Sequence, residues 1–259
     1  DNVGYSIYIV NEYQLKPNES LLALSLDHIL DINFPVNSIV SKQSIPISIK
    51  NLKAKSRVLK SKMVVHGRKS SRIIESKNWV IGTSKSFTEY LSPAREAGTK
   101  MLKLGDRLWT YSPQTDRVIQ ISGHMLRQSV MGSDMSYNDM MEDRPLQEIY
   151  KATITGSETK EGRDHWVISM EAKVIGLPYP KRKTWVDKEY FLPLREELYA
   201  KSGKLLKTAT LKDIKNIQGR WFPGKFIYKD ELKRNSKGTE WIIDNIFLLY
   251  TSDAADEED

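Results

Sequence analysis

Short runs of strand-forming residues follow one another from Asn51 to Leu249, with turn signals between them. Each run mixes β-branched or aromatic residues with charged ones, as in RVLKSKMVV, SRIIESKNWVI and KRKTWVDK. The separators contain Gly, Pro or Asp, and Gly105-Asp106 between two runs is typical of a tight hairpin. Amphipathic segments of helix length are absent between the runs, which argues against a parallel α/β sheet. The pattern therefore predicts an antiparallel meander.

Two of the runs indicate how this sheet is covered. In DHWVISMEAK, the alternate residues Trp166, Ile168 and Met170 share one face, opposite polar residues. This alternation predicts one buried face and one solvated face. The last run, WIIDNIFLLY, is apolar on both faces, so a helix, another layer or a ligand must cover each of them.

The composition excludes several classes of protein. Hydrophobic residues make up 39% and charged residues 28% of the 259, which is typical of a globular chain. No apolar run approaches the roughly 18 residues that a membrane-spanning helix needs, and no signal peptide is visible at the start. The absence of cysteine excludes disulfides, thiolate zinc sites and a cysteine nucleophile.

The net charge of +7 is best explained by a solvated basic face. Lys and Arg are spread along the strands, and no RNP1-like motif, KH loop or zinc module accompanies the basic cluster YPKRKTWVDK. We therefore expect no nucleic-acid partner. The basic surface that includes Lys181, Arg182 and Lys183 is instead expected to dock on an anionic membrane or partner, in a step that salt weakens.

The sequence divides into three parts. Residues 1–50 differ from the rest, and we expect an atypical N-terminal segment there, partly helical or poorly ordered. Residues 51–249 form the predicted β domain. Residues 250–259 are an acidic tail that we expect to be disordered or not native.

The stretch from Ile121 to Glu142 holds five of the eight methionines. Tyr137, Met140 and Met141 are spaced i, i+3 and i+4, which predicts that they share one face of a short helix. That helix is expected to begin near Asp134, whose side chain would cap it. Because methionine adapts to variable apolar partners, two interpretations stand: ordinary core, or a lid over an apolar cavity.

Motifs of catalysis and of metal binding are missing. No H-E-x-x-H, EF-hand loop, Walker A, G-x-G-x-x-G or G-x-S-x-G occurs. A hydrolase needs a nucleophile and a base, and His124 with Asp134 and Ser129 is the local candidate. Asp134, Asp139, Glu142 and Asp143 could offer oxygens to a hard cation. A simpler role for Asp134 or Ser133 is to cap the short helix. We therefore predict no catalytic residue, no metal and no cofactor.

Several strings in the β domain resemble one family. PAREAGTKMLK, LWTYSPQTDR, GHMLRQSVMGSD and AKSGKLLK are similar to segments of the bacterial outer-membrane lipoprotein-sorting proteins, the LolA-like family. The similarity runs from Lys53 to Leu248 and includes a G-x-x-LW-x-Y-x-P element, formed by Gly105, Leu108, Trp109, Tyr111 and Pro113. The resemblance implies a mainly β fold: an incomplete, half-open antiparallel β-barrel with short helices packed in its concave face as a lid.

The resemblance implies a function as well. It implies a periplasmic carrier that binds lipid acyl chains in the concave apolar cavity and helps move them towards the outer membrane, without enzyme activity. Carriers of this family use an arginine on an early strand to hold the lid closed. The expected partners are the acyl chains of a lipid, a lipoprotein or another hydrophobic cargo, and an inner-membrane transporter. Membrane contact is expected to be peripheral and the protein to be a monomer.

The methionine stretch and the family resemblance together give a set of expected lid and cavity residues. Within this set, Met135 is expected to point away from the face that Tyr137 and Met140 share. The alternative is a β scaffold that docks on a membrane transporter and carries nothing, with a concave face filled by its own side chains. The predicted lid and cavity residues are Met125, Leu126, Met131, Met135, Tyr137, Met140, Met141, Trp109, Trp166 and Trp241.

Overall fold

The computed structural model describes residues 56–67, 69–82, 84–142, 144, 146–217, 220–234 and 236–249. The predictions for residues 1–50 and 250–259 lie outside the described residues. Within the described part, no helix has the length and apolar character that crossing a membrane would require.

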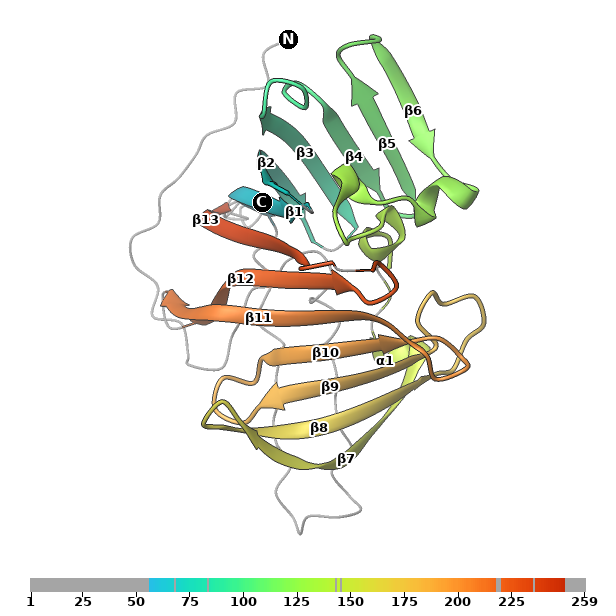
Figure 1. Ribbon diagram of the computed structural model, residues 1–259, viewed down its shortest axis with the longest axis vertical. Coiled ribbons are helices and arrows are strands. Elements are labelled where there is room, and N and C mark those ends of the chain that lie inside the picture. Colours follow the sequence, from blue (N-terminus) through green and yellow to red (C-terminus); the bar gives the residue numbers. More distant parts are fainter. Residues whose placement is uncertain are drawn as a thin grey trace, which may run out of the picture.

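Thirteen strands form one antiparallel sheet, which confirms the mainly β prediction (Figure 1). Neighbouring strands are mostly joined by hairpins, because the turn residues between the runs fold the chain back on itself. The strands are β1 (Ser56–His66), β2 (Ser71–Ile81), β3 (Lys85–Ser92), β4 (Lys100–Leu104), β5 (Arg107–Ser112), β6 (Arg117–Ile121), β7 (Tyr150–Lys160), β8 (Arg163–Ala172), β9 (Lys181–Asp187), β10 (Pro193–Tyr199), β11 (Leu205–Ile217), β12 (Arg220–Asp230) and β13 (Thr239–Leu249).

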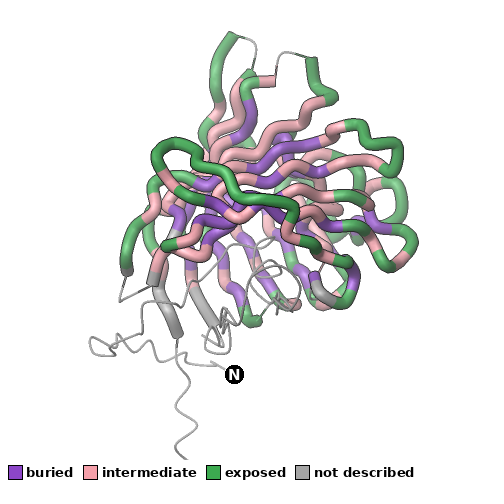
Figure 2. The backbone as a smooth tube through the Cα atoms, turned by 90° about the horizontal axis from the view of Figure 1, so that it is seen from below, coloured by how far each residue is buried: buried purple, intermediate pink, exposed green. Residues whose placement is uncertain are grey.

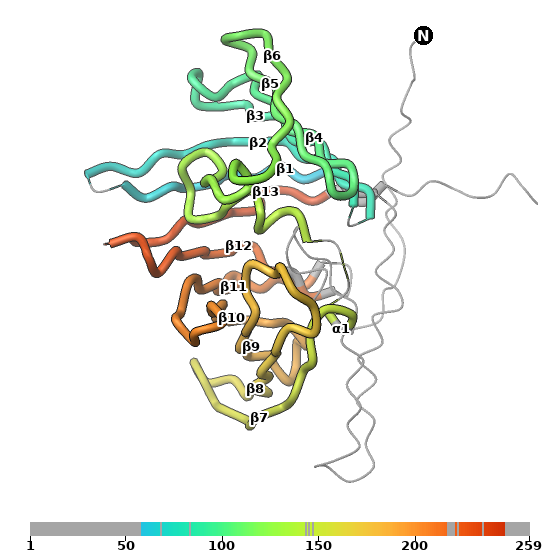
Figure 3. Tube along the Cα trace, turned by 90° about the vertical axis from the view of Figure 1, so that its right-hand side faces the viewer, coloured from blue at the N-terminus to red at the C-terminus, as the bar shows by residue number. Residues whose placement is uncertain are grey.

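The strand order places two consecutive strands at opposite edges of the sheet. The order is β6-β5-β4-β3-β2-β1-β13-β12-β11-β10-β9-β8-β7, so the sheet stays open between β6 and β7. The chain between these two strands must therefore cross from one edge to the other. Figures 1 and 3 show this green segment passing over one face of the sheet towards α1 (Leu146–Ile149). The half-open barrel with a covering segment is confirmed.

The crossing segment contains three 3₁₀ turns in place of the predicted helix: η1 (Gly123–Arg127), η2 (Val130–Gly132) and η3 (Tyr137–Met140). The positive φ of Met131, 49°, and of Gly132, 71°, ends η2 before the predicted helix would begin. Ser136 begins η3, because its amide nitrogen and its hydroxyl donate to Asp139 Oδ2 at 2.6 and 2.8 Å. The predicted start at Asp134 was therefore wrong by two residues.

Two buried clusters of apolar side chains lie along the sheet, and Figure 2 shows buried residues along the strands and exposed ones at the loops. We call the first the lid cluster; its buried members are Met63, Ile74, Tyr90, Met101, Leu108, Ile121, Val130, Met135 and Met140. We call the second the body cluster; its buried members are Leu146, Ile149, Tyr150, Ile168, Met170, Leu177, Val186, Leu192, Leu211 and Phe226.

The pairing between neighbouring strands involves the fewest residues where the two clusters meet. The pairing of β12 with β13 runs over four residue pairs, from Lys225 opposite Ile242 to Tyr228 opposite Thr239. The flanking pairs, β1 with β13 and β11 with β12, each run over ten. We call the β12–β13 pairing the seam. Tyr228 and Trp241 lie on the seam, and both side chains pack against both clusters.

Candidate functional site

The segment from Gly123 to Glu142, which we call the lid, has an apolar underside. Val130, Met135 and Met140 are 0%, 6% and 3% exposed and belong to the lid cluster. The prediction that Met135 points away was wrong. Its carbonyl accepts a hydrogen bond from the Val130 amide at 2.8 Å, which closes a tight turn and directs Met135 inwards.

The other predicted lid residues pack against the same cluster. They are partly buried, as expected for side chains at the margin of a covering segment: Met125, Leu126, Met131, Tyr137 and Met141. Tyr137, Met140 and Met141 thus contact the same cluster, although from a 3₁₀ turn and not from the predicted helix. Tyr90 donates its hydroxyl to the sulfur of Met101 at 3.3 Å beneath the lid, and burial raises the pKa of this phenol.

The three predicted tryptophans lie in three different places. Trp241 packs against both clusters at the seam. Trp166 packs against the body cluster, with its ring 5.8 Å from that of Phe191. Trp109 lies on the opposite face of β5 from the buried Leu108, with the Arg107 guanidinium 5.4 Å from its ring. The structure therefore places Trp109 outside both clusters.

Asp134 fastens the middle of the lid to the loop between β12 and β13. Its Oδ2 accepts a hydrogen bond from the Thr239 hydroxyl at 2.9 Å, and its Oδ1 accepts one from Ser236 at 3.0 Å. The Lys233 ammonium lies 3.5 Å from Oδ1 and also donates to the carbonyl of Ser133 at 2.6 Å. A buried carboxylate with this many donors fixes the position of the backbone that carries it.

Arg72 fastens the lid from the other side. This arginine lies on β2, and its guanidinium donates to the backbone carbonyl of Met131. The next residue, Gly132, has a positive φ, and a Cβ there would stand 3.2 Å from Arg72 Nη2. Glycine at this position therefore lets the guanidinium approach the chain closely. Sequence patterns did not single out Arg72, because nothing in β2 reveals which carbonyl its side chain meets.

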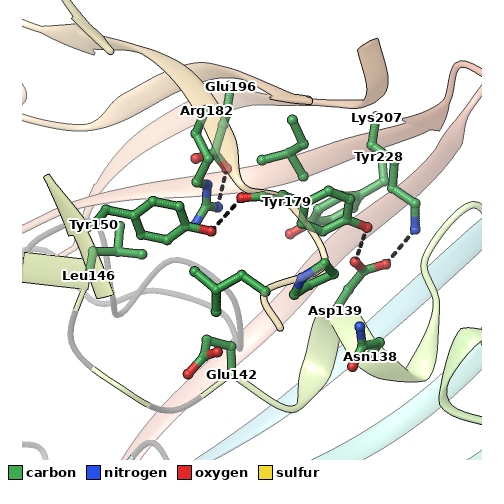
Figure 4. A pocket seen from close by; sticks show the side chains of 13 residues that line it. Asn138, Asp139, Glu142, Leu146, Tyr150, Tyr179, Arg182, Glu196, Lys207 and Tyr228 are labelled. Carbon is green, nitrogen blue, oxygen red and sulfur yellow. Dashed lines mark hydrogen bonds and ion pairs between the residues drawn. The ribbon is translucent and has the colours of Figure 1, made fainter. Parts of the chain in front are cut away.

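Asp139 fastens the end of the lid to the body of the protein, beside a small cavity (Figure 4). Its Oδ2 lies 2.5 Å from the ammonium of Lys207, and its Oδ1 accepts a hydrogen bond from the Tyr179 hydroxyl. Burial raises the pKa of Tyr179, and the charge of Asp139 raises it further. Lys207 lies on β11 and Tyr179 on the loop after β8, so Asp139 contacts two separate parts of the body.

The cavity beside Asp139 has a volume of about 60 Å³ and a mixed lining. Arg182 donates to Glu196 at 2.8 Å, and Tyr150 donates to the carbonyl of Tyr179, also at 2.8 Å. Arg182 had been expected on the basic surface with Lys181 and Lys183; that expectation was wrong, since its guanidinium faces this cavity. The lining residues are Asn138, Asp139, Glu142, Leu146, Tyr150, Leu177, Pro178, Tyr179, Arg182, Glu196, Leu198, Lys207 and Tyr228.

The closed lid leaves too little room here for a lipid chain. Ligand sites for small molecules are on the order of 300–1,000 Å³, several times the volume of this cavity. The apolar space above β1–β5 is filled by the lid's own side chains. A carrier therefore requires the lid to leave, whereas a docking scaffold requires only the arrangement that is present.

The candidate groups for hydrolysis and for metal binding are placed apart from one another. His124 is exposed, whereas Asp134 is buried and bonded to Thr239 and Ser236. Among the described residues, no hydrogen bond links His124, Ser129 and Asp134, and no group of three or more His, Asp or Glu is arranged to hold a metal ion. Asp134 and Asp139 each serve as acceptors for different donors of the body.

Comparisons with known proteins decide the family. A protein-family model with the description "-like: Uncharacterized protein" matches residues 82–253. The chain belongs to this family. No curated protein matches it. The matched residues of this uncharacterized family include the lid, the seam and both clusters apart from the contributions of β1 and β2.

Solved structures show the fold that this family shares with others. A domain described as an outer membrane lipoprotein-sorting protein from Vibrio parahaemolyticus is 23% identical, with a TM-score of 0.67, over 76% of this chain and 86% of that one. A DUF1329 family protein from Desulfovibrio piger is 22% identical, with a TM-score of 0.69, over 76% and 86%. A LolA superfamily protein from Nitrosomonas europaea is 22% identical, with a TM-score of 0.63, over 78% and 89%. The predicted LolA-like resemblance is confirmed at the level of the fold.

Proposed function

We propose that this protein is a periplasmic carrier that shields a lipid acyl chain, with the lid as the element that gives way to the cargo. One observation carries the proposal: the segment that crosses the open sheet covers one face of it with methionines, and side chains of the sheet hold this segment at its middle and near its end. We propose an inner-membrane transporter as the donor, peripheral contact with membranes, a monomeric state and no enzyme activity.

The construction of the lid supports movement. Its backbone forms only short 3₁₀ turns, whose hydrogen bonds are few and poorly aligned compared with those of an α-helix. Segments of this kind open with a lower free energy than strands within a sheet. Methionine side chains can repack around a chain of different shape. An acyl chain that replaces them gains roughly 0.8 kcal/mol for each CH₂ group that it buries.

A second candidate function is the docking scaffold that carries nothing. The filled concave face of the closed state favours it, because a scaffold needs no cavity. The two functions differ in one measurable property, which is whether the lid must open for an acyl chain to bind.

A reversible lock on the lid tests this difference. The chain has no cysteine, so a pair introduced as Asp134→Cys and Thr239→Cys can bond only with itself. The two positions are close, since the amide nitrogen of Asp134 lies 2.9 Å from Thr239 Oγ1. The reduced double variant should bind a fluorescent fatty-acyl probe, and the oxidised one should not. The single variant Thr239→Cys, under both conditions, controls for the redox reagents.

Equal binding in the two redox states would remove the lid from the mechanism. Absence of binding in the reduced variant and in the wild type would favour the scaffold instead. Extraction of the protein purified from its native compartment, followed by mass spectrometry of lipids, provides an independent check, since a carrier should retain part of its cargo.

A further inference from the structure

The contacts of Asp139 divide into those that move with the lid and those that do not. Ser136 belongs to the lid, so its two hydrogen bonds to Asp139 travel with the carboxylate. Lys207 and Tyr179 belong to the body and stay behind. Figure 4 shows the carboxylate of Asp139 between these two donors. Opening of the lid would separate the carboxylate from both.

Lys207 and Tyr179 would be left without an acceptor if Asp139 moved away with the lid. The side chain of Lys207 is only 11% exposed, and that of Tyr179 is largely buried in the cavity wall. A buried ammonium that loses its anion is strongly disfavoured, because the remaining charge is neither solvated nor paired. The cavity has two other carboxylates. Glu142 belongs to the lid and accepts from Arg144, and Glu196 accepts from Arg182 and from Thr184. In the open state, Lys207 and Tyr179 have lost the acceptor that they share, which favours another anion at this place.

The position of this site fits the end of an amphiphile. Its walls include the apolar side chains of Leu146, Leu177 and Leu198 next to the charged ones. Tyr228 lines the cavity and also packs against the lid cluster, so the cavity adjoins the space that the lid methionines occupy. A chain lying in that space would place its polar end beside Lys207 and Tyr179.

We propose that Asp139 occupies, in the closed state, a binding site for the anionic head group of the cargo, a carboxylate or a phosphate. This inference rests on the proposed carrier function and adds to it the class of cargo. The head group takes over the hydrogen bonds that Lys207 and Tyr179 give to Asp139, while the acyl chain takes over the contacts of the lid methionines. Cargo and lid then compete for the same two places.

The competition makes two variants behave differently. Asp139 is absent from the site in the bound state, so Asp139→Asn should raise the affinity for charged and uncharged chains alike and leave their ratio unchanged. Lys207 is present in the bound state, so Lys207→Met should collapse the preference for the charged chain. Tyr179→Phe should reduce that preference in part and is the variant least able to disturb folding. Lys212→Met, an exposed lysine on the same strand, is the matched control.

The experiment measures the binding of three fluorescent probes of equal chain length to the full chain: a fatty acid, its methyl ester and an alkyl phosphate. Circular dichroism first establishes that each variant is folded. The wild type and Lys212→Met should bind at least one of the two anionic probes about ten-fold more tightly than the ester, the effect of one hydrogen bond to a charged group. In Lys207→Met the ratio should fall to about one. The tighter of the two anionic probes identifies the head group.

The outcomes separate this inference from the carrier function. Tight binding of all three probes with equal affinity by the wild type would overturn the head-group site and leave the carrier in place. An anion preference that survives both Lys207→Met and Tyr179→Phe would also overturn it. Failure of every probe to bind the wild type and Asp139→Asn would overturn the carrier and the head-group site together.

Discussion

The two sides of the seam are completed in different ways. On the side of β1–β6, three of the nine buried members of the lid cluster come from the lid itself: Val130, Met135 and Met140. On the side of β7–β12, the body cluster is built from its own strands, from α1 and from the loops between them. The lid gives apolar packing to the first side alone, whereas its polar contacts reach both sides, through Arg72 on β2 and Lys207 on β11. The core on the side of β7–β12 therefore includes no residue of the lid, whereas the core on the side of β1–β6 includes three.

The side of β7–β12 also has polar networks that do not involve the lid. Asp187 is fully buried, and burial alone would raise its pKa. Hydrogen bonds from Arg163, at 2.5 and 2.9 Å, and from the amides of Glu189 and Tyr190 instead hold the pKa of Asp187 below its usual range. Such a network, together with the body cluster, stabilises this side by contacts that do not include the lid.

Matched methionine truncations give the largest expected effect and test this comparison directly. Met170 is 1% exposed in the body cluster, and Met140 is 3% exposed in the lid cluster. Met170→Ala should lower the free energy of unfolding by about 2–5 kcal/mol, the usual range for a truncation in a fixed core. Met140→Ala should cost clearly less, because a movable lid can close over the space. Urea unfolding of both variants measures the difference. Equal losses would mean that the lid is an ordinary part of the core.

Removal of the Asp134 carboxylate should have an intermediate effect that is confined to the lid. Asp134→Ala leaves the hydroxyls of Thr239 and Ser236 without their acceptor, and it should lower the free energy of lid opening by about 1–3 kcal/mol. Hydrogen exchange should quicken in the amides of the lid and not in those of β8 or β9. Asp244→Ala, which removes an exposed partner of Lys62, is the control and should change neither. Faster exchange throughout the sheet would contradict the proposed independence of the body.

The sequence predicted the sheet well because strand and turn signals are local. Alternation predicted which face of β8 packs on the body cluster, since Trp166, Ile168 and Met170 all contact it. The prediction that the opposite face is solvated was wrong in part, because His165 and Val167 on that face are 4% and 3% exposed. The lid was predicted in outline, since Tyr137, Met140 and Met141 all pack on the lid cluster. Its exact form was not predicted, because the left-handed backbone at Met131 follows from tertiary contacts such as that of Arg72.

The fastening residues could not have been found from sequence patterns. Asp134 and Lys233 are about a hundred positions apart, and Asp139 and Lys207 are 68 apart, so no periodicity connects them. The sequence offered Asp134 and Asp139 as members of one acidic stretch, with a cap or a metal as the natural interpretation. The roles of Asp134 and Asp139 differ because the lid crosses the sheet, so that it meets β13 first and β11 afterwards.

The smallest expected effect concerns an ion pair across the seam. Glu240 on β13 lies 3.1 Å from the ammonium of Lys225 on β12, and the hydrogen bond from Lys225 holds the pKa of Glu240 below its usual range. A carboxyl group whose pKa is lowered by folding stabilises the protein above its unfolded pKa, roughly 4.3, and this stabilisation is lost as the pH falls through the folded pKa. Both side chains are partly exposed, so the pair contributes only about 0.2–1 kcal/mol.

Glu240→Gln should therefore lower the urea midpoint slightly at pH 7, and the difference from the wild type should shrink once the pH falls below roughly 4. Glu171→Gln, at an exposed position of β8, is the control at each pH. A difference that persists unchanged in acid would assign the effect to packing and not to charge. The seam has only four paired residues on each strand, so a loss of this pair should also quicken exchange in β13 more than in β8. If both strands respond equally, the seam is not a boundary, and the two sides of the sheet must be treated as one cooperative unit.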